Sequence, residues 1–177
     1  MSLLARVSVL LSERGIAYAV IGAAALAVHG VSRATADLDL LALDPLCLDP
    51  SLWRTLREEG VAVDLRHGDA DDPLAGVARL VHEGAVLDLI LGRSAWQRSV
   101  LERAQPRRIG EVEVPVATAS DLVLLKLYAG GPQDGWDIHQ LLDAEPTLAG
   151  VVEPLVAELP RESVAFWQRI RRERAAQ

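Results

Sequence analysis

Two aspartates, Asp37 and Asp39, are separated by one leucine within the apolar run 37–43. Because successive side chains of a strand alternate, both carboxylates point to one face, and Leu38 and Leu40 point to the other. Aspartate is depleted in strands, and two close carboxylates repel each other, so the pair is unfavourable unless a cation binds it. Hard oxygen ligands of this kind suit Mg²⁺ or Mn²⁺. The alternative explanation is an edge strand that carries charges on its solvent face.

A third aspartate, Asp88, lies in the run 85–91, which is apolar enough to predict a central strand. A carboxylate is out of place in such a strand. If the two strands are neighbours, the three carboxylates can converge on two metal ions about 3.5–4 Å apart, as in phosphoryl or nucleotidyl transfer. Asp64, in the less regular run 61–65, is an alternative to Asp88, but its strand ends at once in Arg66-His67-Gly68.

Gly22 stands between a strand-like run, 18–21, and an alanine-rich segment, 23–29, that favours a helix. A glycine at this junction lets a phosphate approach the backbone, and the free N–H groups of the helix point towards it. A strand, a glycine and a helix form a common pattern. The pattern is informative here because it lies shortly before Asp37, so that the chain can return as the strand adjacent to 18–21.

The basic residues are almost all arginine. Of 18 basic residues, 17 are arginine and one is lysine, Lys126. A chain that uses arginine wherever a positive charge suffices has kept lysine at one position, which indicates that this position needs it.

Charge and cysteine content limit the kinds of protein this can be. The net charge of −7 argues against a broad nucleic-acid-binding face, because such faces neutralise phosphates with basic residues. The single cysteine, Cys47, allows no intramolecular disulfide and suits a reducing, cytoplasmic location. The longest apolar run, 19–28, is about half of the roughly 20 residues that a membrane helix needs, so we expect no membrane span.

The elements that position these residues follow from periodicity and turn residues. Apolar residues at helical spacing predict a helix over 3–11, which Gly15 ends. Runs 77–82 and 85–91 predict antiparallel strands joined by Glu83-Gly84 as a tight hairpin. We also expect a strand at 61–65 and a hairpin at 109–116. Helices are expected at 50–59 with Asp49 as N-cap, from Ser94 to about 104, at 121–129 after a Ser120 cap, and from Pro132 to 143.

The order of these elements predicts the fold class. Helices alternate with strands up to about residue 117, and only helices are expected beyond it. We therefore expect an α/β core over 1–117 and a helical portion over 118–177 that packs on it. The arginine-rich end, 166–174, is interpreted as a solvated terminal helix, with contact to RNA or an acidic partner as the alternative.

Taken together, these segments resemble a known superfamily. The segments 20–25 and 29–40 are similar to the signature of the nucleotidyltransferase-like superfamily, which includes DNA polymerase β. More narrowly, they resemble small bacterial nucleotidyltransferases related to abortive-infection and toxin–antitoxin proteins, with the pattern Gly-Gly, Gly-x-x-Arg-x-Thr and Asp-x-Asp. The segments 121–129 and 133–138 are similar to the lysine helix and the Asp-x-x-Asp helix of that group.

The resemblance implies a nucleotidyltransferase fold, a mixed sheet flanked by helices, and a role for each matching residue. Asp37 and Asp39 would coordinate both metal ions, Mg²⁺ or Mn²⁺, and Asp88 would complete the site and help deprotonate the attacking hydroxyl. The residues that would contact the nucleotide are Gly22, Ala23, Arg33, Thr35 and Lys126. Asp134 and Asp137 would orient Lys126 or hold the C-terminal helices together, with stabilisation of a helix N-terminus as the alternative.

The sequence also departs from the family pattern. The second glycine of the phosphate loop is Ala23, with no serine after it. Between Lys126 and Asp134, where toxin-like relatives usually carry arginine, this chain has Gly130, Gly131 and Gln133. The loop is therefore bulkier and less basic, which bears on turnover and leaves the metal ligands unchanged.

The activity implied is metal-dependent transfer of a nucleoside monophosphate from an NTP, such as ATP, to a hydroxyl acceptor, with release of pyrophosphate. A small molecule, a tRNA end and a protein side chain all remain open as acceptors. The first alternative is a non-catalytic, toxin–antitoxin-like member of the fold that binds a nucleotide or a protein partner. The second is a nucleic-acid-binding regulator, against which the net charge argues.

Overall fold

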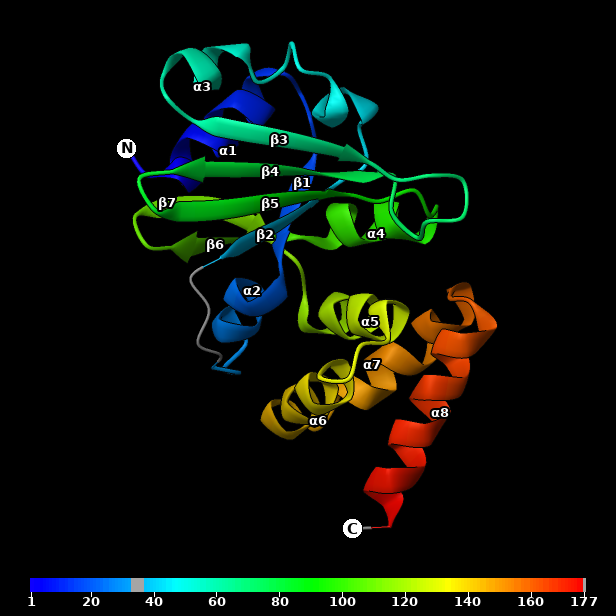
Figure 1. Ribbon diagram of the computed structural model, residues 1–177. Helices are drawn as coiled ribbons and strands as arrows, with labels where there is room; N and C mark the ends of the chain where they lie inside the picture. Colours follow the sequence, from blue (N-terminus) through cyan, green and yellow to red (C-terminus); the bar gives the residue numbers. More distant parts are fainter. Residues whose placement is uncertain (33–36, 177) are drawn as a thin grey trace. The chain divides into compact units, whose positions relative to one another are not determined.

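The computed structural model describes residues 1–32 and 37–176 (Figure 1). It contains two compact units, which we describe separately. The first comprises residues 1–25 and 37–117, and the second comprises residues 26–32 and 118–176. The short segment 26–32 is thus grouped with the helical unit.

Within the described chain, the first unit is built on a seven-stranded mixed sheet with the order β3-β4-β5-β2-β1-β7-β6. The strands are β1 (Tyr18–Ile21), β2 (Leu38–Ala42), β3 (Ala62–His67), β4 (Gly76–His82), β5 (Ala85–Leu91), β6 (Gln105–Ile109) and β7 (Val112–Val116). The pairs β2–β5 and β1–β7 are parallel, and the other neighbouring strands are antiparallel. The mixed sheet and the α/β class agree with the prediction.

Strands β4 and β5 form the predicted hairpin. Its two-residue turn, Glu83-Gly84, has positive φ at both positions, 50° and 80°, as a tight turn between twisted strands requires. The side chains of both strands alternate between a fully buried face, with Leu80 and Leu87, and a partly open face, with Arg79 and Asp88.

The buried side of the sheet is covered by α1 (Leu3–Glu13), which contacts β5 and β7 and lies behind the sheet in Figure 1. The apolar stripe of α1 supplies fully buried Val7 and Leu11. The first unit also contains α3 (Arg54–Glu58) and α4 (Trp96–Arg103), and α2 (Gly22–Val28) begins in it. This packing leaves the opposite face of β4 and β5 to carry polar side chains.

The helix predicted from Asp49 begins later than expected. A 3-10 turn, η1 (Pro45–Leu48), precedes Asp49, and α3 begins only at Arg54. The Asp49 carboxylate instead accepts a hydrogen bond from the Ser51 backbone N–H at 2.8 Å, a local turn that competes with helix formation. That bond and a second one from the Ser51 side chain lower the pKa of Asp49.

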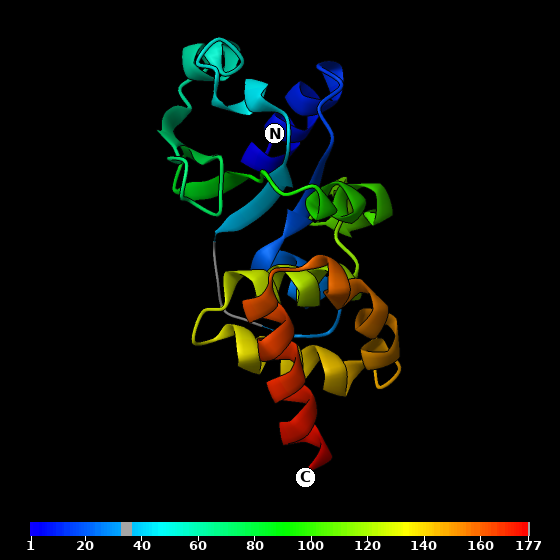
Figure 2. The same ribbon diagram turned by 90° about the vertical axis from the view of Figure 1, so that its right-hand side faces the viewer.

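The second unit is helical (Figures 1 and 2). It contains α5 (Ala119–Ala129), α6 (Asp134–Ala144), α7 (Leu148–Leu155), the 3-10 turn η2 (Val156–Glu158) and α8 (Arg161–Ala175). Helix α5 contacts α6, α7 and α8, and its apolar residues form the centre of the unit's core, which includes Leu122, Leu127, Ile138, Leu141, Trp167 and Ile170. None of the described helices is both long and apolar enough to cross a membrane.

Within the second unit, the starts of α5 and α6 differ from the prediction. Thr118, and not Ser120, caps α5: its Oγ1 accepts the Asp121 backbone N–H at 3.2 Å and lies 2.6 Å from Asp121 Oδ2. Ser120 lies inside the first turn, where it is buried. Helix α6 begins at Asp134 rather than Pro132.

Three arginines of α8 form ion pairs within the helical unit. Arg174 lies 2.7 Å from Asp143, Arg171 lies 3.8 Å from Glu153, and Arg169 lies 3.9 Å from Glu173 one turn along its own helix. The positive charge of the C-terminal helix is therefore partly neutralised by acidic side chains of the same unit.

Candidate active site

The strand register of the first unit brings four charged residues into one row. Asp39 of β2 lies opposite Asp88 of β5, Asp88 lies opposite Arg79 of β4, and Arg79 lies opposite Asp64 of β3. Because residues in direct register project to the same side of a sheet, all four belong to one face. Aliphatic pairs flank the row on β4 and β5: Val77 with Ile90 and Val81 with Val86.

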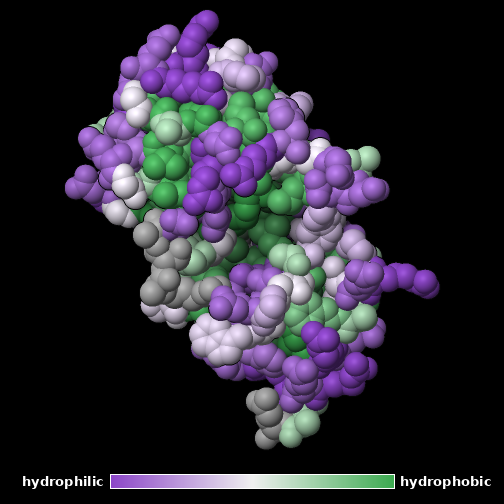
Figure 3. Space-filling view, viewed as in Figure 1, coloured by the Kyte–Doolittle hydropathy of each residue, from purple (hydrophilic) through white to green (hydrophobic). Residues whose placement is uncertain are grey.

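This face of β4 and β5 is open in part. Val77, Val86 and Ile90 are half-buried, and Val81 is exposed. Figure 3, in the view of Figure 1, shows hydrophobic and hydrophilic side chains next to one another over the sheet. The row holds three carboxylates and one guanidinium, so its net charge is negative and attracts cations.

Arg79 contacts two of the three aspartates that the sequence singles out. Its Nη1 lies 3.3 Å from Asp88 Oδ2, and its Nη2 lies 3.8 Å from Asp37 Oδ2. The Asp88 side chain is 19% exposed. Its second oxygen, Oδ1, is buried and has no hydrogen-bond partner among the residues that the structure describes. The Asp88 carboxylate is therefore only half satisfied, which is unusual for a buried polar group.

Gly22 fits tightly against the acidic row. It follows Ile21, which pairs with Asp39 across β1 and β2, and its φ of +63° is one that glycine adopts without strain. A Cβ at Gly22 would overlap Asp39 Oδ2. Ala23 follows as the second residue of α2. The backbone at the start of α2 therefore lies directly against the Asp39 carboxylate.

Two predicted nucleotide-binding residues, Arg33 and Thr35, lie outside the described residues. Asp37 is the first described residue after that gap and precedes β2. Its carboxylate forms an ion pair with Arg79.

The donor set of the row fits a hard divalent cation in kind. Asp39 and Asp88 offer carboxylate oxygens from adjacent strands, and the buried, unsatisfied Oδ1 of Asp88 is an oxygen that a cation would complete. In the described ranges 1–32 and 37–176, however, no three acidic, histidine or cysteine side chains are grouped closely enough to hold a metal ion. The ligand types and strand positions suit Mg²⁺ or Mn²⁺, but the described side chains do not converge on one point.

Lys126 belongs to the helical unit, where two acidic side chains hold it. Its Nζ donates to Asp134 Oδ1 at 2.8 Å and lies 2.6 Å from Asp137 Oδ2. Lys126 is 16% exposed, and the Asp137 side chain is 0% exposed. Asp134 Oδ2 also accepts the Gly131 backbone N–H at 2.7 Å, which fixes the turn between α5 and α6. The three residues predicted from the lysine and Asp-x-x-Asp segments thus form one cluster.

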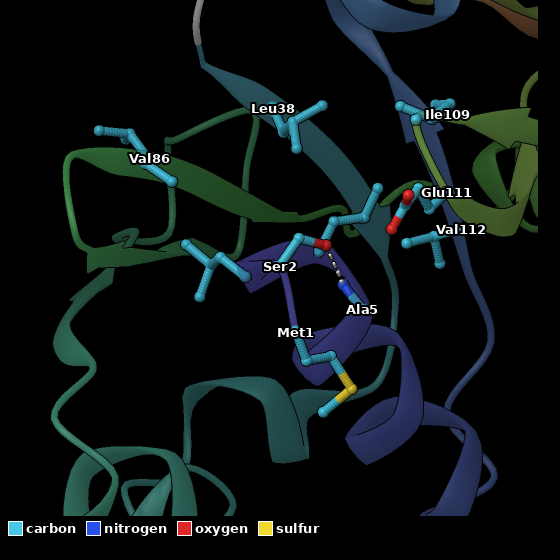
Figure 4. Close-up of a pocket in the computed structure, with 12 residues that line it drawn as sticks. Met1, Ser2, Ala5, Leu38, Val86, Ile109, Glu111 and Val112 are labelled. Carbon is cyan, nitrogen blue, oxygen red and sulfur yellow. Dashed lines mark hydrogen bonds between the residues drawn. The ribbon is translucent and has the colours of Figure 1, made fainter.

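A separate, mainly apolar pocket of about 450 Å³ lies elsewhere in the first unit (Figure 4). It is lined by the N-terminal turn of α1, the starts of β2 and β5 and the β6–β7 turn. Leu38 lines it, and because Leu38 alternates with Asp39 along β2, its side chain points away from the acidic row. None of the described residues predicted for catalysis or nucleotide binding lines this pocket.

Sequence reasoning missed Arg79. The predicted hairpin could have identified Arg79 as a neighbour of Asp88. A two-residue turn at Glu83-Gly84 pairs His82 with Ala85 and, three pairs further on, Arg79 with Asp88. Asp64, the alternative to Asp88, lies on the same face and forms an exposed pair with Arg66 at 2.9 Å.

Solved structures share this architecture. ANT(2'')-Ia in complex with adenylyl-2''-tobramycin has a TM-score of 0.60 and 19% identity, over 94% of this chain and 96% of that one. A nucleotidyltransferase-like protein from Paracoccidioides brasiliensis has a TM-score of 0.57 and 15% identity, over 98% and 88%. The lincosamide adenylyltransferase LnuA, with lincomycin bound, has a TM-score of 0.51 and 14% identity, over 80% and 95%.

The chain has the nucleotidyltransferase fold. The resemblance noted in the sequence is thereby confirmed at the level of the fold. The sequence matches no protein-family model, and no curated protein matches it. At such low identities a nucleotidyltransferase fold does not define the activity, which has to be argued from the residues of the site.

Proposed function

We propose that this protein transfers a nucleoside monophosphate from an NTP to a hydroxyl group and releases pyrophosphate. The observation that carries the proposal is the position of Asp39 beside Asp88 on parallel strands, with Gly22 against Asp39, in a nucleotidyltransferase fold. Two neighbours of the same fold support this choice: ANT(2'')-Ia is described in complex with adenylyl-2''-tobramycin, and LnuA is named a lincosamide antibiotic adenylyltransferase.

In the proposed site, Asp37, Asp39 and Asp88 hold Mg²⁺ or Mn²⁺. When bound, the cations neutralise the carboxylates and the charge that develops on the phosphates. The Asp88 oxygen that has no hydrogen-bond partner among the described residues supports Asp88 as a ligand. The Asp37 carboxylate must leave Arg79 to take part.

The proposed reaction is an in-line displacement. The acceptor hydroxyl oxygen attacks the α-phosphorus, the bond from this phosphorus to the bridging oxygen breaks, and pyrophosphate leaves. The hydroxyl proton passes to the Asp88 carboxylate. No covalent enzyme intermediate is needed, since positioning and charge neutralisation lower the barrier.

The nucleotide would be bound by residues that the family pattern supplies. We propose that the backbone at Gly22 and Ala23 receives the phosphates and that Arg33, Thr35 and Lys126 provide further contacts to the nucleotide. Asp134 and Asp137 are proposed to orient Lys126, which is supported by their contacts with its ammonium group.

For the acceptor, we propose a hydroxyl-bearing small molecule, and ATP as the nucleotide to test first. ANT(2'')-Ia is described with an adenylylated tobramycin and LnuA with lincomycin.

The test is to incubate the protein with each α-labelled NTP, Mg²⁺ and a panel of aminoglycosides, lincosamides, tRNA and proteins. We expect label on a small molecule and release of pyrophosphate. The double variant Asp37→Asn/Asp39→Asn should lose both, whereas Asp64→Asn, a carboxylate of the same sheet face, should retain them. Labelling that survives the double substitution contradicts the metal-dependent reaction. Mg²⁺-dependent thermal stabilisation by an NTP, without pyrophosphate release for any acceptor, would favour the non-catalytic, partner-binding alternative.

A further inference from the structure

Arg79 and a divalent cation would compete for the same two carboxylates, those of Asp37 and Asp88. The guanidinium lies 3.3 Å from Asp88 Oδ2 and 3.8 Å from Asp37 Oδ2. These two aspartates are proposed metal ligands. A divalent cation bound to these carboxylates would repel the guanidinium, so binding of the metal ion weakens both ion pairs.

The surroundings of Arg79 make such an exchange feasible. Its side chain is 44% exposed, so the guanidinium can be hydrated when it leaves the carboxylates. Asp88 is mostly buried and has one oxygen, Oδ1, without a hydrogen-bond partner among the described residues. The side chain of Arg79 is therefore long and exposed, and it pairs with only one of the two carboxylate oxygens of Asp88.

We propose that Arg79 is a positioning residue that holds the carboxylates of Asp88 and Asp37 until divalent cations bind. It then contacts the phosphates of the nucleotide. This inference rests on the proposed function. Three carboxylates beside one guanidinium leave a net negative charge, which attracts metal ions. Once two divalent cations occupy the carboxylates, the cluster together with Arg79 is net positive, which favours a polyanion such as a triphosphate.

The first test measures metal binding without nucleotide. Free Mn²⁺ is followed by electron paramagnetic resonance during titration of the full chain and of Arg79→Gln. Removal of the competing cation should lower the Kd for Mn²⁺ about tenfold, which corresponds to about 1.4 kcal/mol. Arg79→Lys retains the charge without the planar fork and should give an intermediate Kd. The matched control is Arg66→Gln, which breaks the exposed Arg66–Asp64 pair of the same sheet and should leave the Kd unchanged.

The second test measures the nucleotide. In Arg79→Gln the KM for the NTP at saturating Mn²⁺ should rise several-fold, because a positive charge is lost beside the phosphates. Tighter metal binding together with weaker nucleotide binding distinguishes this role from a structural one, which would weaken both. Circular dichroism establishes that each variant is folded. If Arg79→Gln does not fold, Arg79→Lys provides the comparison.

Two outcomes overturn the inference. If the wild-type protein transfers nucleotide but its Kd for Mn²⁺ equals that of folded Arg79→Gln, Arg79 does not compete with the metal, and the proposed function stands. If the wild-type protein neither binds Mn²⁺ nor releases pyrophosphate, the proposed function fails and the inference fails with it.

Discussion

Gly22 and Asp39 are in contact with no space for a side chain between them, since a methyl group on Gly22 would overlap the Asp39 carboxylate. The register of β1 and β2 causes this approach, because it places Ile21 opposite Asp39 and Gly22 directly after it. The acidic row therefore depends on a glycine that lies 17 positions earlier in the chain.

Gly22→Ala should destabilise the first unit and abolish catalysis. The left-handed φ of +63° costs alanine about 1–2 kcal/mol, and displacement of Asp39 adds about 1–3 kcal/mol. Gly15→Ala is the matched control, because Gly15 has a φ of +67° and no atom within 4 Å of an added Cβ. Urea unfolding should show the larger loss for Gly22→Ala, and only Gly22→Ala should lose pyrophosphate release. Equal losses of stability would contradict the close contact.

Asp88→Asn should lower nucleotidyl transfer by at least about a hundredfold, as expected when a proton acceptor and charge ligand is removed. Asp64→Asn should retain activity, because Asp64 lies two strands away in the same row and pairs with Arg66. Initial rates of pyrophosphate release at fixed Mg²⁺ separate the two. If Asp64→Asn is inactive and Asp88→Asn is active, Asp64 and not Asp88 is the proton acceptor and metal ligand.

Lys126→Met should lower the free energy of unfolding by about 3–5 kcal/mol, because it removes the cation paired with buried Asp137 and with Asp134. Arg174→Met, which breaks the more exposed pair with Asp143, should cost less than about 1 kcal/mol. Chemical unfolding measures both. A mild effect of Lys126→Met would show that the cluster contributes little to stability.

Lys126→Arg tests the nucleotide contact separately from charge. A guanidinium keeps the positive charge beside the two carboxylates, but it is planar and larger than an ammonium group, so it presents its N–H donors in a different geometry. We expect a stable protein with a several-fold higher KM for the NTP. A wild-type KM would remove Lys126 from the nucleotide site and leave the high ratio of arginine to lysine as a feature of composition alone.

Cys47 should resist thiol reagents in the folded protein. Burial, with the nearby charge of Asp44 as a smaller cause, raises the pKa of the Cys47 thiol to about 12. At about pH 8 its reaction with a disulfide reagent should be slow until denaturant is added. Because the folded protein keeps this proton while the unfolded chain loses it, stability should fall as the pH rises from about 9 towards 12. In Cys47→Ala this part of the pH dependence should disappear.

The sequence by itself determined the local elements of this protein. The hairpin of β4 and β5 follows from alternating side chains and the Glu83-Gly84 turn, and α1 follows from its apolar stripe. Such signals involve residues close together in the chain, so they survive without knowledge of distant neighbours. The pairing of Arg79 with Asp88 can also be predicted from the sequence, by counting residues back from the turn. The start of α3 could not be predicted, because the side chain of Asp49 forms a competing local turn.

Only the tertiary structure decided how the site is put together. Asp39 and Asp88 meet because β2 and β5 pair in parallel, and a long intervening chain leaves that register unspecified. The contact between Arg79 and Asp37 and the enclosure of Lys126 by Asp134 and Asp137 likewise depend on which charged groups the folded backbone brings within a few ångströms. Composition and spacing identify carboxylates and a lysine suited to phosphate chemistry, but electrostatic pairing depends on distance in space, which the fold alone sets.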